Sequence, residues 1–423
     1  MAKIKSIKAR QVFDSRGFPT VEAEVVLDNG AFGRAIVPSG ASTGTLEAVE
    51  LRDGGSKFAG KSVSKAARNV NEIIAKELVG FDALDQAGLD KKLIELDGTE
   101  QKSKLGANAI LAVSLGSARA ASGSEPFYKR IAKIYKQAGG KKGLSLPMPM
   151  VNVLNGGAHA SGGVDIQEVM LMPIGAKNLS RAMQMTAEVF YALKNRLKKA
   201  GQPTTVGDEG GFAPNLPGNE AALELLVESI KDSPFEYGKD IKLALDLASS
   251  EFYAGGKYRL SSDGRELSSD RMIDWLADLI GKYQVISIED GLAEDDWPAW
   301  AKLTKKLGSK VQLVGDDLLV TNPKLLKKAI KNKSANAILI KLNQIGTLSE
   351  TIEAIITAQN AGWGTVISHR SGETEDTTIA HLAVGTGAGQ IKTGSISRGE
   401  RTAKYNELIR IAEQIGDNKL ANI

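Results

Sequence analysis

The chain has 423 residues and a mass of 44.9 kDa, and 54 Lys and Arg against 50 Asp and Glu give a formal net charge of +4. A chain of this length has room for roughly two or three domains. The absence of Cys excludes disulfide scaffolds, thiolate zinc sites and cysteine nucleophiles. Because the chain has only three His, a bound metal would take mainly oxygen ligands, which favours magnesium, calcium or manganese.

No apolar run approaches the ~18 residues of a membrane span. The N-terminal segment MAKIKSIKAR is basic and lacks the apolar core of a signal peptide. We therefore expect a cytoplasmic protein, with an additional cell-surface or secreted pool as the alternative.

The positive charge is concentrated in the first third of the chain. Residues 1–140 hold 21 Lys and Arg and 16 Asp and Glu, a net +5, whereas the remainder holds 33 and 34, a net −1. Residues 129–142 contain six basic residues and no acidic residue. This pattern is typical of a solvated helix end and linker. The alternative, a contact with RNA or another acidic surface, lacks a nucleic-acid motif or interleaved aromatic residues.

The first 140 residues have the pattern of a small α+β domain. The alternating segments SIKARQVF and TVEAEVVL predict two strands, and Asp28-Asn29-Gly30 then predicts a hairpin turn into AFGRAIV. Helical patterns follow around residues 61–78 and 105–120. The glycine- and proline-rich stretch from residue 139 to residue 149 predicts a boundary between a first domain of residues 1–140 and a second of residues 141–423.

From about residue 241, short runs rich in Ile, Leu and Val alternate with helical stretches. The runs are IKLALD, QVISIE, VQLVGDD, ANAILIK, GTVISHR and QIKTG. This alternation predicts a parallel sheet covered on both faces. With PMPMVNVLN and VDIQEVMLM upstream, eight strands favour an α/β fold with a (β/α)8 TIM-like barrel. A doubly wound sheet is the alternative, but the glycines of GTGAG lack the G-x-G-x-x-G spacing.

Each of these predicted strands ends at an ionisable residue. In a barrel the strand ends would converge on the rim at which active sites of this fold lie. Three carboxylates come first and cations follow, and the residues are Asp246, Glu289, Asp316, Lys341, His369 with Arg370, and Lys392. Clustered carboxylates repel one another unless a cation lies among them, and Mg²⁺ with its preference for oxygen ligands would meet this need.

The cations that follow suit a substrate with phosphate or carboxylate groups. Divalent cations would repel the proton of Lys341, so we expect a lowered pKa and a role as a base. Glu209 in the glycine-lined segment GDEGG and Glu168 in DIQE are candidate acids. Together these groups suit proton abstraction next to a carboxylate, with stabilisation of the resulting enolate.

Nine segments of the chain resemble the enolase family, and the resemblance extends from end to end. They are SGASTG (39–44), NGGAHA (155–160), DIQE (165–168), GDEGG (207–211), SIEDGL (287–292), VGDD (314–317), ILIKLNQIG (338–346), SHRSGETED (368–376) and IKTGS (391–395). The resemblance implies interconversion of 2-phosphoglycerate and phosphoenolpyruvate with two Mg²⁺ per active site. It also implies a small α+β domain before an eight-stranded barrel, and a homo-oligomer, either a dimer or an octamer.

The resemblance also implies roles for individual residues. Asp246, Glu289 and Asp316 would hold the tightly bound Mg²⁺, and Ser42 on the mobile loop 39–44 would bind the second. Lys341 would remove the C2 proton, Glu209 would help the C3 hydroxyl to leave with Glu168 assisting, and His159 would act from another mobile loop. The implied substrate-binding residues are Gln167, His369, Arg370, Ser371 and Lys392.

One position departs from the family pattern, because His381 stands where an acid is usual. We expect His381 to lie on the outer surface. Two alternative functions share most of these features. One is a superfamily relative that acts on another carboxylate, and the other is a second role as a surface adhesin or an RNA-assembly component.

Overall fold

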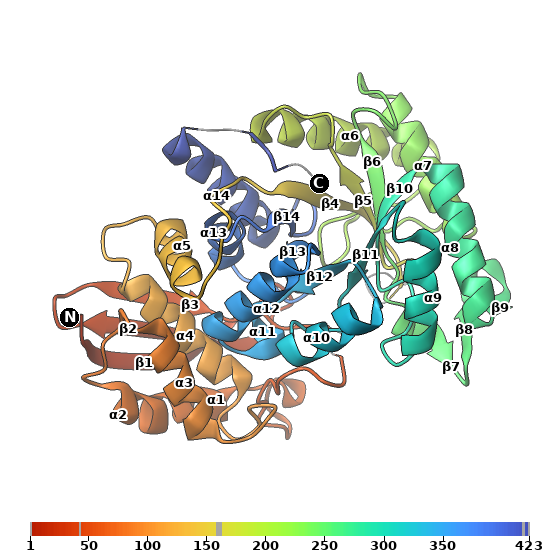
Figure 1. Ribbon diagram of the computed structural model, residues 1–423. Helices are drawn as coiled ribbons and strands as arrows, with labels where there is room; N and C mark the ends of the chain where they lie inside the picture. Colours follow the sequence, from red (N-terminus) through yellow and green to blue (C-terminus); the bar gives the residue numbers. More distant parts are fainter. Residues whose placement is uncertain (1, 42–43, 158–162, 417–418, 422–423) are drawn as a thin grey trace.

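The computed structural model describes residues 2–41, 44–157, 163–416 and 419–421. Two of the predicted site residues, Ser42 and His159, lie outside these described residues. The chain forms a smaller N-terminal part that lies beside a closed barrel (Figure 1). Within the described ranges, no helix combines the length and the apolar character that crossing a bilayer requires.

The N-terminal part begins with an antiparallel sheet in the order β1 (Ile4–Phe13), β2 (Pro19–Leu27), β3 (Phe32–Ile36). The predicted hairpin between β2 and β3 is confirmed, and the Gly30 amide closes its turn on the carbonyl of Leu27 at 3.0 Å. Gly30 has φ of 82°, a left-handed conformation that glycine adopts without strain.

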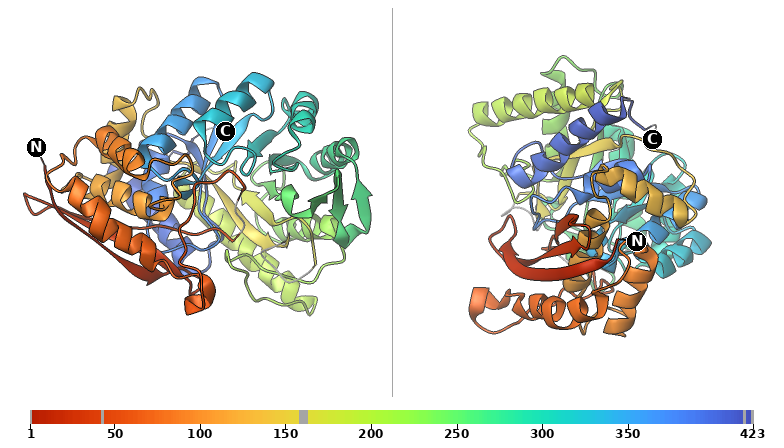
Figure 2. Two further views of the ribbon diagram at one scale, coloured as in Figure 1. Left: turned by 90° about the horizontal axis from the view of Figure 1, so that it is seen from below. Right: turned by 90° about the vertical axis from the view of Figure 1, so that its left-hand side faces the viewer.

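Helices cover this sheet on one side, as the two views of Figure 2 show. The most extensive contacts come from α4, which packs on β2 and β3 and is buried along almost its whole length. The predicted helical segments are confirmed in α1, η2 and α2, which run on from one another, and in α4. The bounds are η1 (Lys57–Gly60), α1 (Ser64–Asn69), η2 (Val70–Ile74), α2 (Ala75–Leu78), α3 (Gln86–Asp97), α4 (Ala107–Ala120) and α5 (Phe127–Gln137).

The barrel confirms the predicted fold class. In the described part of the chain it closes in the order β10-β11-β12-β13-β14-β4-β5-β6. The expectation of a wholly parallel sheet is wrong at β5, which runs antiparallel to both β4 and β6. The strands are β4 (Met148–Asn155), β5 (Glu168–Met172), β6 (Lys242–Asp246), β10 (Val285–Glu289), β11 (Gln312–Gly315), β12 (Ala337–Ile340), β13 (Gly364–Ser368) and β14 (Gly389–Lys392).

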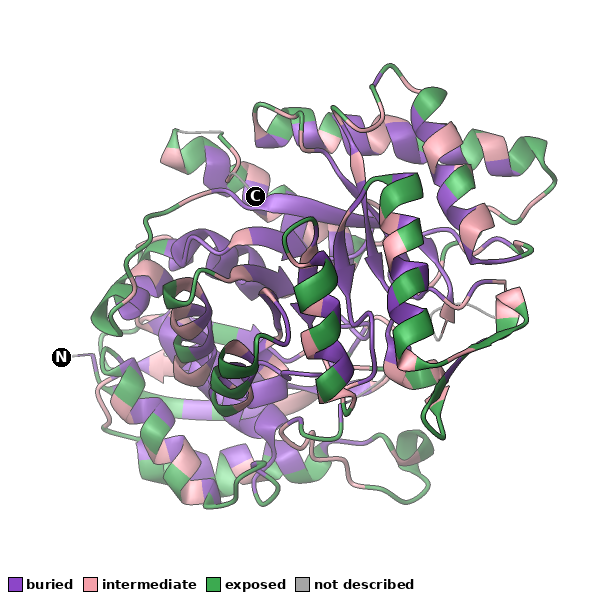
Figure 3. Ribbon diagram, turned by 45° about the vertical axis from the view of Figure 1, so that its right-hand side comes forward, coloured by how far each residue is buried: buried purple, intermediate pink, exposed green. Residues whose placement is uncertain are grey.

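Helices surround the barrel, and most of them have one buried and one exposed face (Figure 3). The barrel strands are buried except for one half-buried residue at or near the start of five of them. Several helices begin at the caps that the sequence supplies; the Asn322 side chain, for example, accepts a hydrogen bond from the Lys324 amide at 2.9 Å. The helices are α6 (Leu179–Lys199), α7 (Asn219–Lys231), α8 (Ser269–Tyr283), α9 (Trp297–Leu307), α10 (Pro323–Asn332), α11 (Leu342–Ile345), α12 (Leu348–Asn360), α13 (Thr378–Gly385) and α14 (Gly399–Ile415). The insertion after β6 holds η4 (Ser249–Phe252), β7 (Tyr253–Ala254), β8 (Lys257–Leu260), η5 (Ser261–Asp263) and β9 (Arg265–Leu267).

One sequence expectation about polar residues on helices is wrong, and a second holds at every basic residue of its stretch except one. His381 is not on the outer surface: it is 7 % exposed and its ring lies against Phe127 and Tyr128 of α5. Within the basic stretch 129–142, Arg130 is also buried, and its guanidinium donates to the carbonyl of Leu84 at 2.9 Å. In both cases packing between helices covers a side chain that a surface position would leave in water.

Polar contacts join the N-terminal part to the barrel. The Asp90 carboxylate of α3 accepts from the Ser349 amide of α12 at 2.9 Å, and the Lys102 ammonium lies 3.0 Å from Glu350. The segment before residue 42 reaches the barrel rim, where the Ala41 amide donates to the Ser371 hydroxyl at 2.6 Å. The N-terminal part thereby contributes to the same edge of the barrel as the ionisable strand ends.

Candidate functional site

The ionisable strand ends lie at one rim of the barrel. Asp246, Glu289 and Lys392 are the last residues of their strands, and Asp316, Lys341 and His369 directly follow theirs. One small cavity brings these elements together. Among the residues that line it are Gln167, Glu168, Glu209, Asp246, Asp316, Lys341, His369, Arg370, Ser371 and Lys392.

Strand direction explains how Glu168 reaches this rim. It is the first residue of β5, and because β5 runs antiparallel, its start lies beside the ends of the neighbouring strands. In the register, Glu168 is the direct partner of Asp246, which in turn is the partner of Glu289. Three carboxylates therefore lie side by side on adjacent strands, although like charges in such positions repel.

The ammonium of Lys392 offsets this repulsion. Its Nζ lies 2.8 Å from Asp246 Oδ2, 2.9 Å from Glu289 Oε1 and 3.0 Å from Glu168 Oε1. Burial opposes a charged lysine here, but the three carboxylates outweigh burial and raise the pKa of Lys392 well above its ordinary value. Lys392 therefore serves as a buried counter-ion for the carboxylate row.

A second lysine pairs with the third predicted metal ligand. The Lys341 ammonium donates to Asp316 Oδ2, and the Gln344 amide donates to Asp316 Oδ1 at 2.9 Å. Burial opposes the charged form, but Asp316 and Glu289 prevail and raise the pKa of Lys341. The expected lowering concerns a lysine that faces divalent cations, whereas these contacts show that Asp316 favours the charged form.

The carboxylate set has the chemistry that a divalent cation requires. Burial, reinforced by Asp246, raises the pKa of Glu289 well above its ordinary value, so the ionised row needs more positive charge than the lysines supply. Among the described residues, Glu289 Oε2 is buried and has no hydrogen-bond partner. An orphaned carboxylate oxygen beside Asp246 and Asp316 fits a hard cation with oxygen ligands.

Two aspartates near this set were not predicted from the sequence. Asp290 accepts hydrogen bonds from the Asp316 and Asp317 amides, each at 2.9 Å, and so fixes the backbone that carries Asp316. Burial and the adjacent Asp316 raise the pKa of Asp317 to about 8. Oxygen atoms of Asp290, Asp316 and Asp317 lie within 4.8 Å of one another. The sequence did hold a signal for both: Asp290 directly follows Glu289 in SIEDGL, and Asp317 directly follows Asp316 in VGDD.

The Glu209 carboxyl lies in a second polar group on the same rim. It is 3 % exposed, and its Oε2 accepts from the Asn152 amide at 3.0 Å and lies 3.6 Å from His369 Nε2. The loop that carries Glu209 is held to the end of β14, because the Ser395 amide donates to the Glu209 carbonyl at 2.8 Å. Glycines allow this close approach: a Cβ on Gly394 would lie 2.7 Å from that carbonyl.

Arg370 forms a buried ion pair with Glu47 of the N-terminal part. The guanidinium donates to the two Glu47 oxygens at 2.9 and 3.3 Å and to Asn343 Oδ1 at 3.1 Å. Burial opposes the charge of Arg370, but Glu47 prevails and raises its pKa. Glu47 was not predicted from the sequence, because its partner lies in the other part of the chain.

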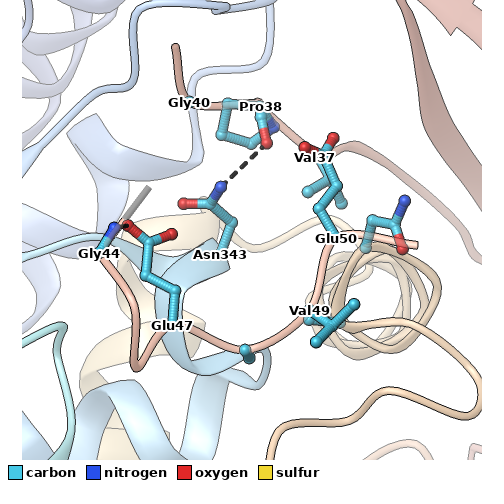
Figure 4. Close-up of a pocket in the computed structure, with 11 residues that line it drawn as sticks. Val37, Pro38, Gly40, Gly44, Glu47, Val49, Glu50 and Asn343 are labelled. Atoms are coloured by element: carbon cyan, nitrogen blue, oxygen red, sulfur yellow. Dashed lines mark hydrogen bonds between the residues drawn. The ribbon is translucent and has the colours of Figure 1, made fainter. Parts of the chain in front are cut away.

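The segment that contains Glu47 encloses a cavity beside the rim. The cavity has a volume of about 270 Å³ and is lined in part by residues 37, 38, 40, 44 and 47–50 and by Asn343. The Asn343 side chain donates to the Pro38 carbonyl at 3.2 Å (Figure 4). The Glu47 carboxylate also accepts from the Gly44 amide at 3.0 Å. The described residues on either side of Ser42 are thus held differently: Ala41 is bonded to Ser371 of the barrel, and Gly44 is bonded to Glu47, the ion-pair partner of Arg370.

Comparison with protein families agrees with this architecture. The model of the enolase N-terminal domain matches residues 4–131, and the model of the enolase C-terminal TIM barrel domain matches residues 143–422. The second match alone covers more than half of the chain. The chain therefore belongs to the enolase family, whose members are lyases that use divalent metal ions.

Proposed function

We propose that this protein is a glycolytic enolase that catalyses the reversible dehydration of 2-phosphoglycerate to phosphoenolpyruvate. The observation that carries the proposal is the position of a base and two acids on opposite walls of one cavity. Lys341 follows β12, and Glu168 begins β5, four strands away in the closed ring. Glu209 lies beside Glu168, and all three residues line the cavity.

Lys341 is the proposed base for the C2 proton. Its ammonium is held on Asp316 in this structure, so it must give up its proton before it acts. Positive charge on Asp316 from a bound cation would weaken that hold, since the carboxylate would no longer favour the charged lysine. The expected lowering of the lysine pKa thus depends on the loaded site.

Glu209 is the proposed acid that protonates the departing C3 hydroxyl, with Glu168 assisting. Burial, together with Glu209, raises the pKa of Glu168 well above its ordinary value, which favours the protonated form of this carboxyl. A carboxyl that holds its proton at neutral pH is suited to general acid catalysis. Removal of the C2 proton and loss of the C3 hydroxyl would then depend on different side chains.

Asp246, Glu289 and Asp316 are the proposed ligands of the first Mg²⁺, and Ser42 is the proposed ligand of the second. Two bound Mg²⁺ would supply positive charge for the substrate carboxylate, which gains negative charge as the C2 proton leaves. Arg370, Ser371 and Lys392 are proposed to bind the phosphate and carboxylate groups, and Gln167 and His369 lie beside them. His159 remains a proposed catalytic residue outside the described part of the chain.

Several further features are proposals that rest on the family resemblance. The domain division at residues 140 and 141 gives a first domain that contributes the loop 39–44 to the site of the second. A homo-oligomer and a cytoplasmic location complete the proposal.

A substrate panel tests the proposed function against a superfamily relative. Purified protein is assayed with Mg²⁺ on 2-phosphoglycerate, on unphosphorylated glycerate and on other 2-hydroxy and α-branched carboxylates. We expect turnover of 2-phosphoglycerate alone, since the cations at the rim match both of its anionic groups. Turnover of an unphosphorylated carboxylate with no activity on 2-phosphoglycerate would assign the site to another reaction.

A further inference from the structure

The guanidinium of Arg401 connects two segments of the rim, residues 369–371 and the loop that carries Glu209. Arg401 lies near the start of α14 and is fully buried. Its Nη1 contacts His369 Nδ1 and donates to the Arg370 carbonyl at 2.6 Å. Its Nη2 donates to the Ser371 carbonyl at 2.6 Å and to the Asp208 carbonyl at 3.0 Å. The four terminal N–H groups of the guanidinium are therefore all used.

These contacts decide the protonation of His369. Arginine nitrogens carry donors alone, so His369 Nδ1 must accept, and a neutral imidazole then carries its proton on Nε2. That Nε2 lies 3.6 Å from Glu209 Oε2. Burial lowers the pKa of His369 well below its ordinary value; Arg401, Lys392 and Lys341 act in the same direction, and Glu209 opposes them.

We propose that Arg401 is a positioning residue for the acid of the reaction: it holds His369 as the neutral tautomer with an Nε2 proton aimed at Glu209. It also fixes the Glu209 loop against the segment that carries Arg370 and Ser371. The inference deepens the proposed function and rests on it for the role of Glu209.

This arrangement determines where the acid carries its proton. The Asn152 amide donates to Glu209 Oε2 at 3.0 Å, and the His369 Nε2 proton faces the same oxygen. A proton on the Glu209 carboxyl is therefore favoured at Oε1. An imidazolium in place of the neutral ring would favour the ionised form of Glu209 and leave less of the protonated carboxyl that a general acid needs, because an adjacent positive charge favours the carboxylate. Arg401 prevents this by placing its own charge on the far side of the ring.

The surrounding chain is shaped to admit this side chain. Gly394, which follows β14, has φ of 74°, and a Cβ there would lie 2.8 Å from Arg401 Cδ. The Tyr405 hydroxyl, one turn further along α14, donates to the Gly394 carbonyl at 2.9 Å. Gly394 therefore leaves the room that the Arg401 side chain occupies, and Tyr405 holds the Gly394 backbone in place.

Nitrogen NMR of histidine-labelled protein tests the proposal without any need for turnover. The chain has three His, so ¹⁵N-histidine labelling gives three rings, and His369→Gln identifies the signals of His369 by their disappearance. We expect the wild-type ring of His369 to stay neutral with its proton on Nε2 from pH 5.5 to pH 8. A ring protonated on Nδ1, or one that titrates in this range, would overturn the proposal even if the Arg401 variants do not fold.

Two substitutions test the role of the guanidinium. Arg401→Gln removes the charge and most donors, so we expect His369 to titrate at a higher pH or to change tautomer. Arg401→Lys keeps the charge but not the planar fork, and we expect a neutral ring with kcat reduced about tenfold or more and KM little changed, because the acid is misplaced. An unchanged His369 spectrum in folded Arg401→Gln would overturn the proposal. Absence of enolase turnover in the wild type would instead refute the proposed function and leave the NMR result intact.

Discussion

Glu168 and Asp246 are direct partners in the register of β5 and β6, and the Lys392 ammonium lies within 3.0 Å of an oxygen of each. The pairing exists because β5 runs antiparallel and presents its first residue at the rim where β6 ends. Two buried carboxylates in contact are costly unless a cation compensates them. The strand reversal thus places an additional carboxylate at the rim, opposite Lys341.

Single substitutions of Lys341 and Glu209 should distinguish the proposed base from the proposed acid. Lys341→Ala removes the base, so exchange of the C2 proton with solvent should fall by about 10²–10⁴-fold together with dehydration. Glu209→Gln leaves the base in place, so it should retain part of the C2 exchange while losing dehydration. Exchange is followed by NMR in deuterated buffer. If both variants lose exchange to the same extent, the assigned roles are wrong.

Asp290 should control metal affinity without being a ligand itself. Asn at this position keeps the shape but accepts only one of the two amide bonds from Asp316 and Asp317. We expect Asp290→Asn to weaken Mg²⁺ binding by about 10–100-fold, as is typical when the support of a ligand is lost. Calorimetric titration with Mg²⁺ measures this change. The control is Asp278→Asn on the exposed face of α8, and equal affinities in the two variants would contradict the prediction.

The buried ion pair of Glu47 and Arg370 should contribute more to the free energy of unfolding than an ion pair on the surface. Glu47→Gln removes a carboxylate from a buried guanidinium, and we expect the free energy of unfolding to fall by about 3 kcal/mol. Glu100→Gln breaks an exposed pair with Lys324 and should change the free energy of unfolding much less, because solvent screens an exposed pair. Urea denaturation compares the two variants with the wild type.

Inorganic phosphate should also raise the Tm of Glu47→Gln more than that of the wild type, because Arg370 has lost a competing anion.

Stability should depend on Glu407 in a defined pH range. The contact with His381 and that with Arg410 lower the pKa of Glu407 to about 2, against the effect of burial. A depressed folded-state pKa stabilises the protein above the unfolded pKa of about 4.3, and this contribution is lost as the pH falls toward 2.

The corresponding experiment uses urea denaturation at several pH values. Glu407→Gln should lower the free energy of unfolding at pH 6 by about 1 kcal/mol after allowance for solvent screening, and the difference should shrink by pH 3. Glu413→Gln, on the exposed face of the same helix, is the control and should show no such trend. A difference that grows as the pH falls would contradict the assigned sign.

Much of the fold could be predicted from the hydrophobic pattern of the sequence. Apolar runs with ionisable ends indicated the barrel strands, because a buried strand requires continuous apolar residues and its polar end must leave the core. The direction of β5 was not predictable in this way, since VDIQEVMLM has the same apolar character in either direction. His381 did carry a signal of burial: it lies in the apolar helix TIAHLAVG, and a helix that is apolar on all sides is buried.

The supporting residues of the site were harder to predict than its central ones. Arg401 belongs to the charged segment GERTAKYNELIR, and nothing local distinguishes it from the exposed Arg410 of the same helix. Its burial follows from the packing of its guanidinium against the carbonyls of Asp208, Arg370 and Ser371, which are contacts between distant parts of the chain. Glu47 likewise acquires its partner only when the two parts of the molecule meet. Sequence patterns report local periodicity, and these contacts are tertiary.

Formation of phosphoenolpyruvate from 2-phosphoglycerate by the purified protein tests the central claim most directly. The reaction is followed with saturating Mg²⁺, after removal of metal with a chelator, and after Mg²⁺ is restored. The account predicts turnover with Mg²⁺, loss on chelation and recovery on restoration. Absence of phosphoenolpyruvate from folded protein with saturating Mg²⁺, or turnover that survives complete removal of divalent metal, would contradict it.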